Sequence, residues 1–565
     1  MRRVLFASIV FGLVACTPAA KGPVAPPAFA MFVDAHYVAR LSYKPTAATY
    51  AGIHEHDAEL EDLSTKRIER RITELQHEME IIARFDRSKL SFDEAIDLEA
   101  IGLEVQSEFF DLAIVRTWQK NPMIYAGLPG RSIDSIMKRA FAPGPERVKL
   151  VTGRLTAIPA LYVAARANLL QPPAREHTEL AIRMAKGSAA FLEKQVLDWA
   201  RTESSGSPPQ EFLDADGKAI AAAHEFATWL ETELLPKSTG SYALGPAMFH
   251  KKLLLDEMIE MPLDQVLARG EQQLEKDYKE FIATAAKIDS KKTPAEVMKA
   301  LSEDHPKETE LIAFVAASLE DARKFVVEKQ LVTLPSEVRP KVSETPGFAR
   351  AATFASMDTP GAYETVATEA FYYVTPTETF WDEKHKEEHL RMFNRWVTPI
   401  INVHEAFPGH YLQFLWRKQL PTKTRKLYGV SSNSEGWAHY TEQMIVDQGF
   451  GGGDPRMRLA QLQEALVRDC RYVAGIKMHT AGWTVDQATK LFEEKSFSEP
   501  ANAREEARRG TYNPTYLYYT YGKIEIQALA AEYKAKKGGT LRDFHDAFVR
   551  LGTLPLPLVR RLLLR

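Results

Sequence analysis

The chain has 565 residues, of which 45% are hydrophobic, so it can bury a large core and is not expected to be disordered. Its formal net charge is −3, and no stretch forms the concentrated basic face that phosphate binding needs. Nucleic acid is therefore not an expected partner, and the length allows one large domain or several smaller ones.

The N-terminus is typical of a secretory signal peptide over residues 1–15. The stretch "MRRVLFASIVFGLVA" has two arginines and then an apolar run too short to span a bilayer comfortably. The following "LVAC" resembles the lipobox of bacterial lipoproteins, in which the cysteine after the cleavage site is acylated. We therefore predict lipidation of Cys16 and a Pro/Ala-rich tether over residues 16–30. The alternative is an ordinary cleaved signal followed by a chance cysteine.

An acylated Cys16 makes the lipid bilayer an expected partner of the chain. Thr17 follows it, rather than the Asp that commonly retains lipoproteins at an inner membrane, so we expect the outer membrane, facing the periplasm. Only Cys470 then remains, so no intramolecular disulfide is expected despite the oxidising compartment.

The body of the chain has mainly helical periodicity. An apolar stripe at helical spacing predicts a helix of about five turns, and it comprises Ile68, Ile72, Leu75, Met79 and Ile82. The stretches "SFDE" at Ser91 and "TPAE" at Thr293 match the capping box that begins a helix. The aromatic stretch from Phe371 is the best candidate for an extended segment. We predict a single large helical unit over residues 31–565, with lobes over 31–240 and 241–565.

The stretch "NVHEAFPGHYLQ" holds a His-Glu pair and a second histidine six positions after the first. In a regular helix His404 and His410 would be about 240° apart with roughly 9 Å of rise between them, and could not share a metal. Pro408 cannot donate to the carbonyl of His404, and Gly409 permits the unusual backbone angles that a bulge requires. The Pro-Gly interruption could therefore bring His410 round to His404. The alternative is a helix end that happens to hold two histidines.

A zinc site needs a third ligand, for which the best candidate is Glu435 in "SNSEGWAHYTEQ", 25 residues after His410. Alone, Glu435 would be better explained as a cap on the helix dipole. The stretch "HKEEH" places His385 and His389 at the usual zinc-helix spacing, but Lys386 stands where the catalytic Glu should be. Its surroundings are almost all charged, so we interpret it as a solvated helix face.

The pattern H-E-x-x-P-G-H followed by E-G-W-A-x-Y resembles the bacterial domain-of-unknown-function 885 family, whose members resemble gluzincin-type zinc peptidases with a helical, neurolysin-like architecture. The resemblance extends across most of residues 31–565. It implies a two-lobed, mainly α fold with a short β element near the active site. It also implies a zinc ion bound by His404, His410 and Glu435, with Glu405 as the general base. The chain departs from relatives in "GIKMH" and in "NPT", near His479 and Tyr519.

Three further residues are candidates for the chemistry. Tyr519 and His479 could donate to a developing oxyanion, and Arg508 could pair with a substrate carboxylate. The spacing of Tyr519 with Tyr516 and Lys523 is equally that of an ordinary helix face.

Two functions stay open on the sequence. The first is a membrane-tethered zinc hydrolase, a peptidase or carboxypeptidase-like enzyme, acting on peptides at the cell envelope. The second is an envelope lipoprotein that binds peptides without hydrolysing them. Glu405 favours the enzyme, because a pure binder needs no general base beside its metal ligands.

Overall fold

The computed structural model describes residues 27–347, 349–350 and 353–565. These residues are mainly α-helical and include one small three-stranded sheet, which confirms the predicted fold class. The signal peptide, Cys16 and residues 17–26 of the tether lie outside the described residues. The first helix already begins at Phe29, two residues before the predicted start of the folded unit.

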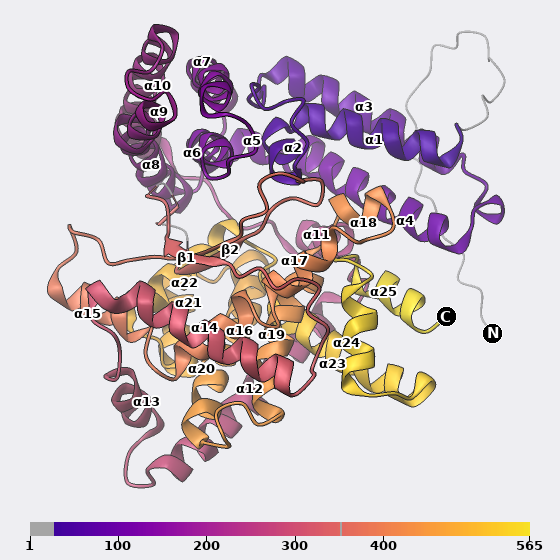
Figure 1. The fold of residues 1–565 in the computed structure, drawn as a ribbon, viewed down its shortest axis with the longest axis vertical. Coiled ribbons are helices and arrows are strands. Elements are labelled where there is room, and N and C mark those ends of the chain that lie inside the picture. The colour runs from indigo at the N-terminus through magenta and orange to yellow at the C-terminus, as the bar shows by residue number, and fades with distance from the viewer. Residues whose placement is uncertain (1–26, 348, 351–352) are drawn as a thin grey trace.

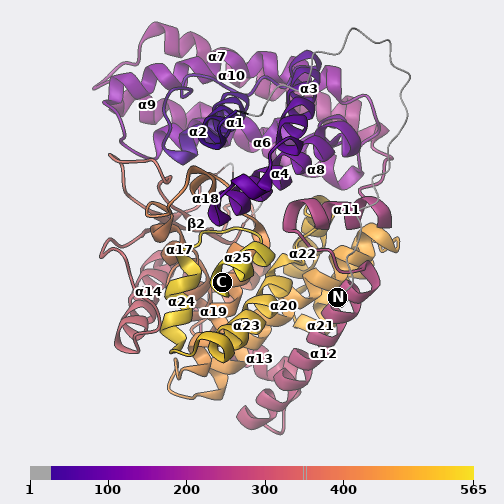
Figure 2. The same cartoon turned by 90° about the vertical axis from the view of Figure 1, so that its right-hand side faces the viewer.

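The helices of the first 240 residues form the upper part of the molecule in Figure 1, with α4 at its lower border, and Figure 2 shows the same layer from the side. They are α1 Phe29–Tyr43, α2 Pro45–Ala51, α3 Thr65–Ala83, α4 Phe92–Phe109, α5 Thr117–Lys120, α6 Met123–Met137, α7 Gly144–Asn168, α8 Arg175–Ala190, α9 Leu197–Glu203 and α10 Gln210–Trp229. Short 3₁₀ or π-helical turns extend or connect them: η1 Arg87–Lys89, η2 Phe110–Val115, η3 Phe191–Val196, η4 Leu230–Leu234 and η5 Leu235–Lys237.

The remaining helices form the lower part of both views. They are α11 Pro246–Glu257, α12 Leu263–Ile288, α13 Pro294–Ser302, η6 Glu308–Glu310, α14 Leu311–Glu328, α15 Glu383–Arg391, α16 Val397–Glu405, α17 His410–Arg417, α18 Lys423–Leu427, α19 Ser431–Asp447, α20 Pro455–Thr480, α21 Val485–Ser496, α22 Pro500–Tyr512, α23 Tyr518–Lys537, α24 Leu541–Val549 and α25 Leu556–Leu563.

Local sequence signals account for several helix starts. The predicted apolar stripe lies on α3, whose Ile68 and Leu75 are fully buried. Ser91 and Thr293 form the two predicted capping boxes, each accepting from the backbone N–H of a Glu three residues later. These three predictions are confirmed.

Separate hydrophobic cores stabilise the two layers. One core is built entirely from residues 125–234 of the upper layer. The largest core contains residues 274–563 of the lower layer and takes in Ile96 and Ala100 of α4. Because α4 also contributes Leu98 and Ile101 to a core with α1 and α3, it joins the layers. The division of the chain into lobes at residue 240 stays a prediction about its domain organisation.

Helix α7 is, among the described helices, the one long and apolar enough to cross a membrane by length and composition. Half of its most apolar stretch is buried inside the protein. Its Arg147 and Arg154 donate to the backbone carbonyls of Ala142 and Ser132. We therefore describe α7 as a core helix of the upper layer.

The small sheet packs against the segment that carries the His-Glu pair. Its strands are β1 Lys341–Glu344, β2 Ala355–Asp358 and β3 Phe371–Val374, in the order β1-β3-β2. The central strand β3 pairs parallel to β1 and antiparallel to β2. Its Tyr372 and Val374 share a hydrophobic core with Ala406 and Phe407. The predicted extended segment at Phe371 is thus confirmed, and it lies beside the proposed site.

Candidate metal centre

The helix that carries His404 ends one residue later, and His410 begins a new helix. Helix α16 ends at Glu405 and α17 starts at His410, with Pro408 and Gly409 between them. A Cβ atom on Gly409 would lie 1.9 Å from the carbonyl oxygen of His404, and the Gly409 N–H donates to the Val403 carbonyl. The predicted interruption is therefore present. Gly409, with φ −75° and ψ −129°, adopts backbone angles outside the usual helix and strand regions, as predicted, and its lack of a Cβ also permits the close approach to the His404 carbonyl.

The interruption brings both imidazoles to Glu435. The Nε2 atoms of His404 and His410 lie 3.3 and 3.2 Å from the same oxygen, Oε2 of Glu435. One ligand atom from each of the three residues lies within 4.8 Å of the other two. Among the described residues, this is the group of His, Cys, Asp or Glu side chains whose spacing suits a metal ion. Both histidines are buried, whereas the Glu435 side chain is 24% exposed. The three predicted ligands therefore converge at one point that solvent can reach.

Glu435 is held in place by close helix packing. A Cβ atom on Gly436 would lie 2.5 Å from the Cα of Gly522, so α19 and α23 touch through two glycines. The indole N–H of Trp437 donates to the Pro408 carbonyl, which ties α19 to the interruption between α16 and α17. The cap of α19 is Glu257, which accepts from the Ser432 N–H. Glu435 is thus free of the capping role that was its alternative explanation.

Glu442 makes a further contact with the centre that sequence reasoning missed. It lies on α19 two helical turns after Glu435, on the same face, and its Oε1 is 2.6 Å from Nδ1 of His404. Arg468 approaches the same oxygen at 3.2 Å, and His439 approaches the other carboxylate oxygen at 3.1 Å. Because Glu442 accepts the Nδ1 proton, Nε2 is the nitrogen of His404 that would bind a metal ion once its own proton is lost.

The charges around His404 favour a bound cation. Burial opposes protonation of His404, but hydrogen bonds to Glu435 and Glu442 outweigh it and raise its pKa to about 9. Burial would also raise the pKa of Glu435, but the charge of His410 and hydrogen bonds from both imidazoles lower it well below its usual value. A metal ion bound at Nε2 of His404 would replace the proton on that nitrogen, so metal binding should release a proton.

Glu405 lies beside this cluster without a partner of its own. Its side chain is buried, and it makes no hydrogen bond or ion pair with any residue that the structure describes. The hydroxyl of Tyr372, on β3, is also buried and unpartnered, and the charge of Glu405 contributes to raising the pKa of that phenol. The Glu405 oxygens are not among the fully buried side-chain atoms that lack a partner, so water can reach this carboxylate, as a general base requires.

Tyr519 lies against the centre, as one of the two interpretations predicted. Its ring stacks on that of His404 with centroids 6.1 Å apart. The Arg509 guanidinium donates to the Tyr519 hydroxyl over 2.8 Å, and Arg471 lies 5.0 Å from the ring centroid. Burial raises the pKa of Tyr519. Since Tyr516 and Lys523 are also buried, this is not an ordinary solvated helix face.

His479 and Arg508 are not brought to the cluster. The imidazole of His479 donates to the Gly510 carbonyl over 2.8 Å and stacks on Phe249, and burial lowers its pKa to about 4. Arg508 pairs with Glu505 at 2.7 Å, on the side of α22 that faces α8. Neither has a contact with the three ligands among the described residues. The predicted oxyanion role of His479 and the predicted substrate contact of Arg508 therefore gain no support.

The "HKEEH" helix, α15, is not the solvated face that the sequence suggested. His389 is buried, donates to the Thr375 carbonyl over 2.8 Å and has its pKa lowered to about 4 by burial. His385 stacks on Trp381 with centroids 4.1 Å apart. The prediction that this pair is separate from the proposed site agrees with the cluster found at His404, His410 and Glu435.

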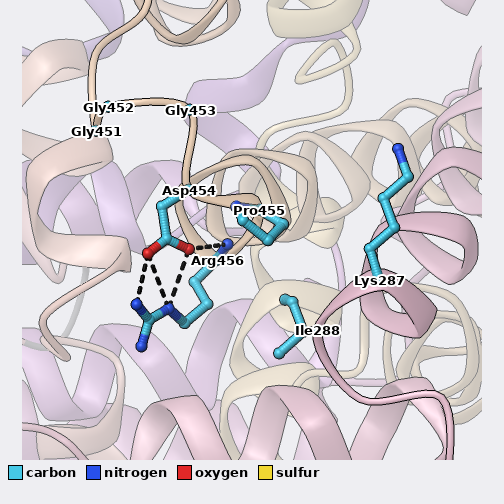
Figure 3. Close-up of a pocket in the computed structure, with 8 residues that line it drawn as sticks. All are labelled: Lys287, Ile288, Gly451, Gly452, Gly453, Asp454, Pro455 and Arg456. Atoms are coloured by element: carbon cyan, nitrogen blue, oxygen red, sulfur yellow. Dashed lines mark hydrogen bonds and ion pairs between the residues drawn. The ribbon is translucent and has the colours of Figure 1, made fainter.

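A cleft of about 720 Å³ between the two layers approaches the centre. Its upper wall comes mainly from α1, α4 and α6, and its lower wall includes Ser431 of α19 and Tyr518 of α23. The ring of Tyr518 lies 5.0 Å from that of Tyr519. The open pocket in Figure 3 is a different feature, because it lies between the end of α12 and the Gly451–Arg456 loop, and Asp454 caps α20 there. The three candidate ligands do not line the inter-layer cleft themselves, but Ser431 precedes Glu435 by one helical turn and Tyr518 is the neighbour of Tyr519, so the cleft passes close to the centre.

The comparisons with known proteins agree with this fold. The model of DUF885, described as a bacterial protein of unknown function, matches residues 45–563. The chain belongs to the DUF885 family. A solved structure from Shewanella oneidensis, described as a candidate lipoprotein of unknown function, has 28% identity, covers 95% of this chain and 100% of its own, and superposes with a TM-score of 0.78.

A second solved structure, of a candidate lipoprotein from Colwellia psychrerythraea, has 17% identity and a TM-score of 0.79, and covers 95% of this chain and 98% of its own. At that identity it shows the shared fold alone. No curated protein matches the chain. The activity of this DUF885 protein must therefore be inferred from its site.

Replacing Glu442 with Gln is expected to weaken zinc binding by about 10- to 100-fold, because His404 loses the carboxylate that orients its ring. Glu464→Gln is a matched control, since Glu464 pairs with the same Arg468 but does not contact His404. Competition with a fluorescent zinc chelator measures both variants. Equal zinc affinity in Glu442→Gln and the wild type would show that Glu442 does not contribute to zinc binding.

Proposed function

We propose that this DUF885 protein is a zinc-dependent hydrolase that cleaves peptides at the cell envelope. The observation that carries the proposal is the convergence of His404, His410 and Glu435 within 4.8 Å, beside the partnerless carboxylate of Glu405. The resemblance of the motifs to gluzincin-type peptidases and to a neurolysin-like architecture supports the same function. A site that only bound metal would need no general base beside its ligands.

The residues present fit a catalytic zinc ion. Two imidazoles and one carboxylate with an open position form a known catalytic zinc set, and calcium or magnesium would prefer oxygen ligands. The contact of His404 Nδ1 with Glu442 fixes the tautomer that exposes Nε2. Zinc held by these three ligands would polarise a substrate carbonyl and acidify a water molecule.

The chain's own residues would then handle the protons and the developing charge. Glu405 would accept the proton of the attacking water and pass it to the leaving amine. The Tyr519 hydroxyl accepts from Arg509, so its own proton is free to be donated to the oxyanion that forms on the former carbonyl. The cleft between the layers would hold the peptide on either side of the scissile bond.

The experiment that tests this function offers a mixed peptide library to the purified protein with and without a zinc chelator. Cleavage that is lost on chelation and restored by zinc supports the enzyme. If the zinc-loaded protein binds peptides but cleaves none of them, the second function, a peptide-binding envelope lipoprotein, replaces it.

The proposed location is the outer membrane, facing the periplasm, with the lipid anchor on Cys16. The lipobox-like "LVAC" and the candidate-lipoprotein description of the Shewanella relative support this. Cys16→Ser is expected to abolish incorporation of labelled fatty acid and to release the protein from membrane fractions. Recovery of the wild type as an unmodified soluble protein would contradict the anchor.

A further inference from the structure

Arg509 lies one side chain away from the metal centre and has no acidic partner. It occupies the last turn of α22 and donates from Nη2 to the hydroxyl of Tyr519 over 2.8 Å. The ring of Tyr519 in turn stacks on His404. No carboxylate of the described residues lies within the 4.0 Å that defines an ion pair with its guanidinium. Its other N–H groups have no acceptor among the described residues.

The neighbouring arginines, in contrast, are neutralised. Arg471 forms two parallel hydrogen bonds with Glu506, of 2.6 and 2.7 Å. Arg468 pairs with Glu442 and Glu464. The group of Arg471, Glu506 and Arg509 therefore carries one surplus positive charge beside the proposed zinc site. The free N–H groups of Arg509 are not among the fully buried unpartnered atoms, so an anion from solvent or from a ligand can reach them.

The cleft between the layers passes close to Arg509, which does not line it itself. The cleft between the layers is lined by Tyr512, Asn513 and Tyr518, which belong to the turn that joins α22 to α23. Arg509 lies at the base of that turn, and its guanidinium contacts the neighbour of Tyr518. A peptide in the cleft that reaches the metal centre would therefore bring one end near Arg509.

We propose that Arg509 binds the terminal carboxylate of the substrate, so that the enzyme cleaves peptides close to their C-terminus. This inference rests on the proposed peptidase function. The planar guanidinium matches a carboxylate in a bidentate pair, and the α-carboxylate is the anion that every unblocked peptide carries. Arg509 contacts Tyr519, and Tyr519 stacks on His404, so the distance from Arg509 to the metal centre is short. Since each extended residue covers at most about 3.6 Å, the scissile bond would lie within a few residues of the terminal carboxylate.

The test compares one peptide sequence made as the free C-terminal acid and as the carboxamide. Wild type is expected to have a KM for the acid about 10- to 100-fold lower than for the amide, as a charged hydrogen-bonded pair predicts. Arg509→Met should raise the KM of the acid to that of the amide. Arg508→Met is the matched control, because Arg508 pairs with Glu505, has no contact with Tyr519 among the described residues and should keep the preference.

Three outcomes would overturn the inference. Equal cleavage of acid and amide by the wild type removes terminal recognition. An equal loss of kcat for both peptides in Arg509→Met makes Arg509 a positioning residue for Tyr519. A preference that follows an acidic side chain, in an amide peptide with Glu in place of Gln, assigns the anion to that side chain.

A binding measurement separates this inference from the peptidase proposal. Calorimetry of the zinc-loaded Glu405→Gln protein needs no turnover, and we expect it to bind the acid at least about 10-fold more tightly than the amide. That preference should be lost when Arg509→Met is added. If no peptide is cleaved but the protein still prefers the acid, the peptidase proposal fails and carboxylate recognition by Arg509 stands. If peptides are cleaved but the acid is not preferred, the peptidase proposal stands and recognition by Arg509 fails.

Discussion

Glu405→Gln is expected to lower peptide turnover by about 10²- to 10⁴-fold, the usual contribution of a general base, while zinc content stays at the wild-type level. The amide keeps the size and shape of the carboxylate but can neither accept nor return the proton. Glu405 makes no hydrogen bond or ion pair with the described residues, so the substitution breaks none, and the amide fills the same space. A loss of activity would then report chemistry and not unfolding.

The comparison needs zinc-loaded wild type, the variant and a chelated wild-type sample, each offered the same peptide. Initial rates give turnover, and elemental analysis of the same samples gives zinc per chain. A variant that cleaves as fast as the wild type would show that Glu405 is not the base. A variant that loses zinc would show that Glu405 is a ligand, contrary to its placement beside the cluster.

The convergence of His404 and His410 could be predicted from local sequence because the interruption is itself local. Two histidines six positions apart cannot share a metal in a regular helix, so Pro408 and Gly409 had to change the helix direction. A second need for Gly409 could not be predicted, because it depends on how closely the backbone passes the carbonyl of His404. That approach is a property of the folded chain and not of the motif.

Helix phase decided which other residues reached the site. Glu442 could have been found, because it lies seven residues after Glu435 and therefore on the same helix face. Arg508 was predicted to reach the site, whereas its neighbour Arg509 is the arginine that contacts Tyr519. Neighbouring residues on a helix point about 100° apart, and the sequence does not fix which side of α22 faces α23. The burial of His389 was not predicted because its neighbours in sequence are charged. Its hydrogen bond to the Thr375 carbonyl, just after β3, depends on how the chain folds and cannot be read from the local sequence.

Removal of a zinc ligand is the second large effect. His404→Ala or Glu435→Ala leaves two protein ligands where catalytic zinc normally has three, so zinc content should fall from about one ion per chain to near zero after dialysis. Both side chains also lose their contacts with each other, so a folded-state measurement such as circular dichroism accompanies each variant. Activity should fall together with the zinc content. Adding micromolar zinc should restore the activity of neither variant.

The most direct test of a metal centre at His404, His410 and Glu435 is the zinc content of the dialysed protein, measured by inductively coupled plasma mass spectrometry. His385→Ala is the control, because His385 belongs to the other closely spaced histidine pair and stacks on Trp381 outside the cluster. We predict about one zinc per chain in the wild type and in His385→Ala, and almost none in His404→Ala or Glu435→Ala. Full zinc retention in both ligand variants, or loss of zinc in His385→Ala, would contradict the assignment.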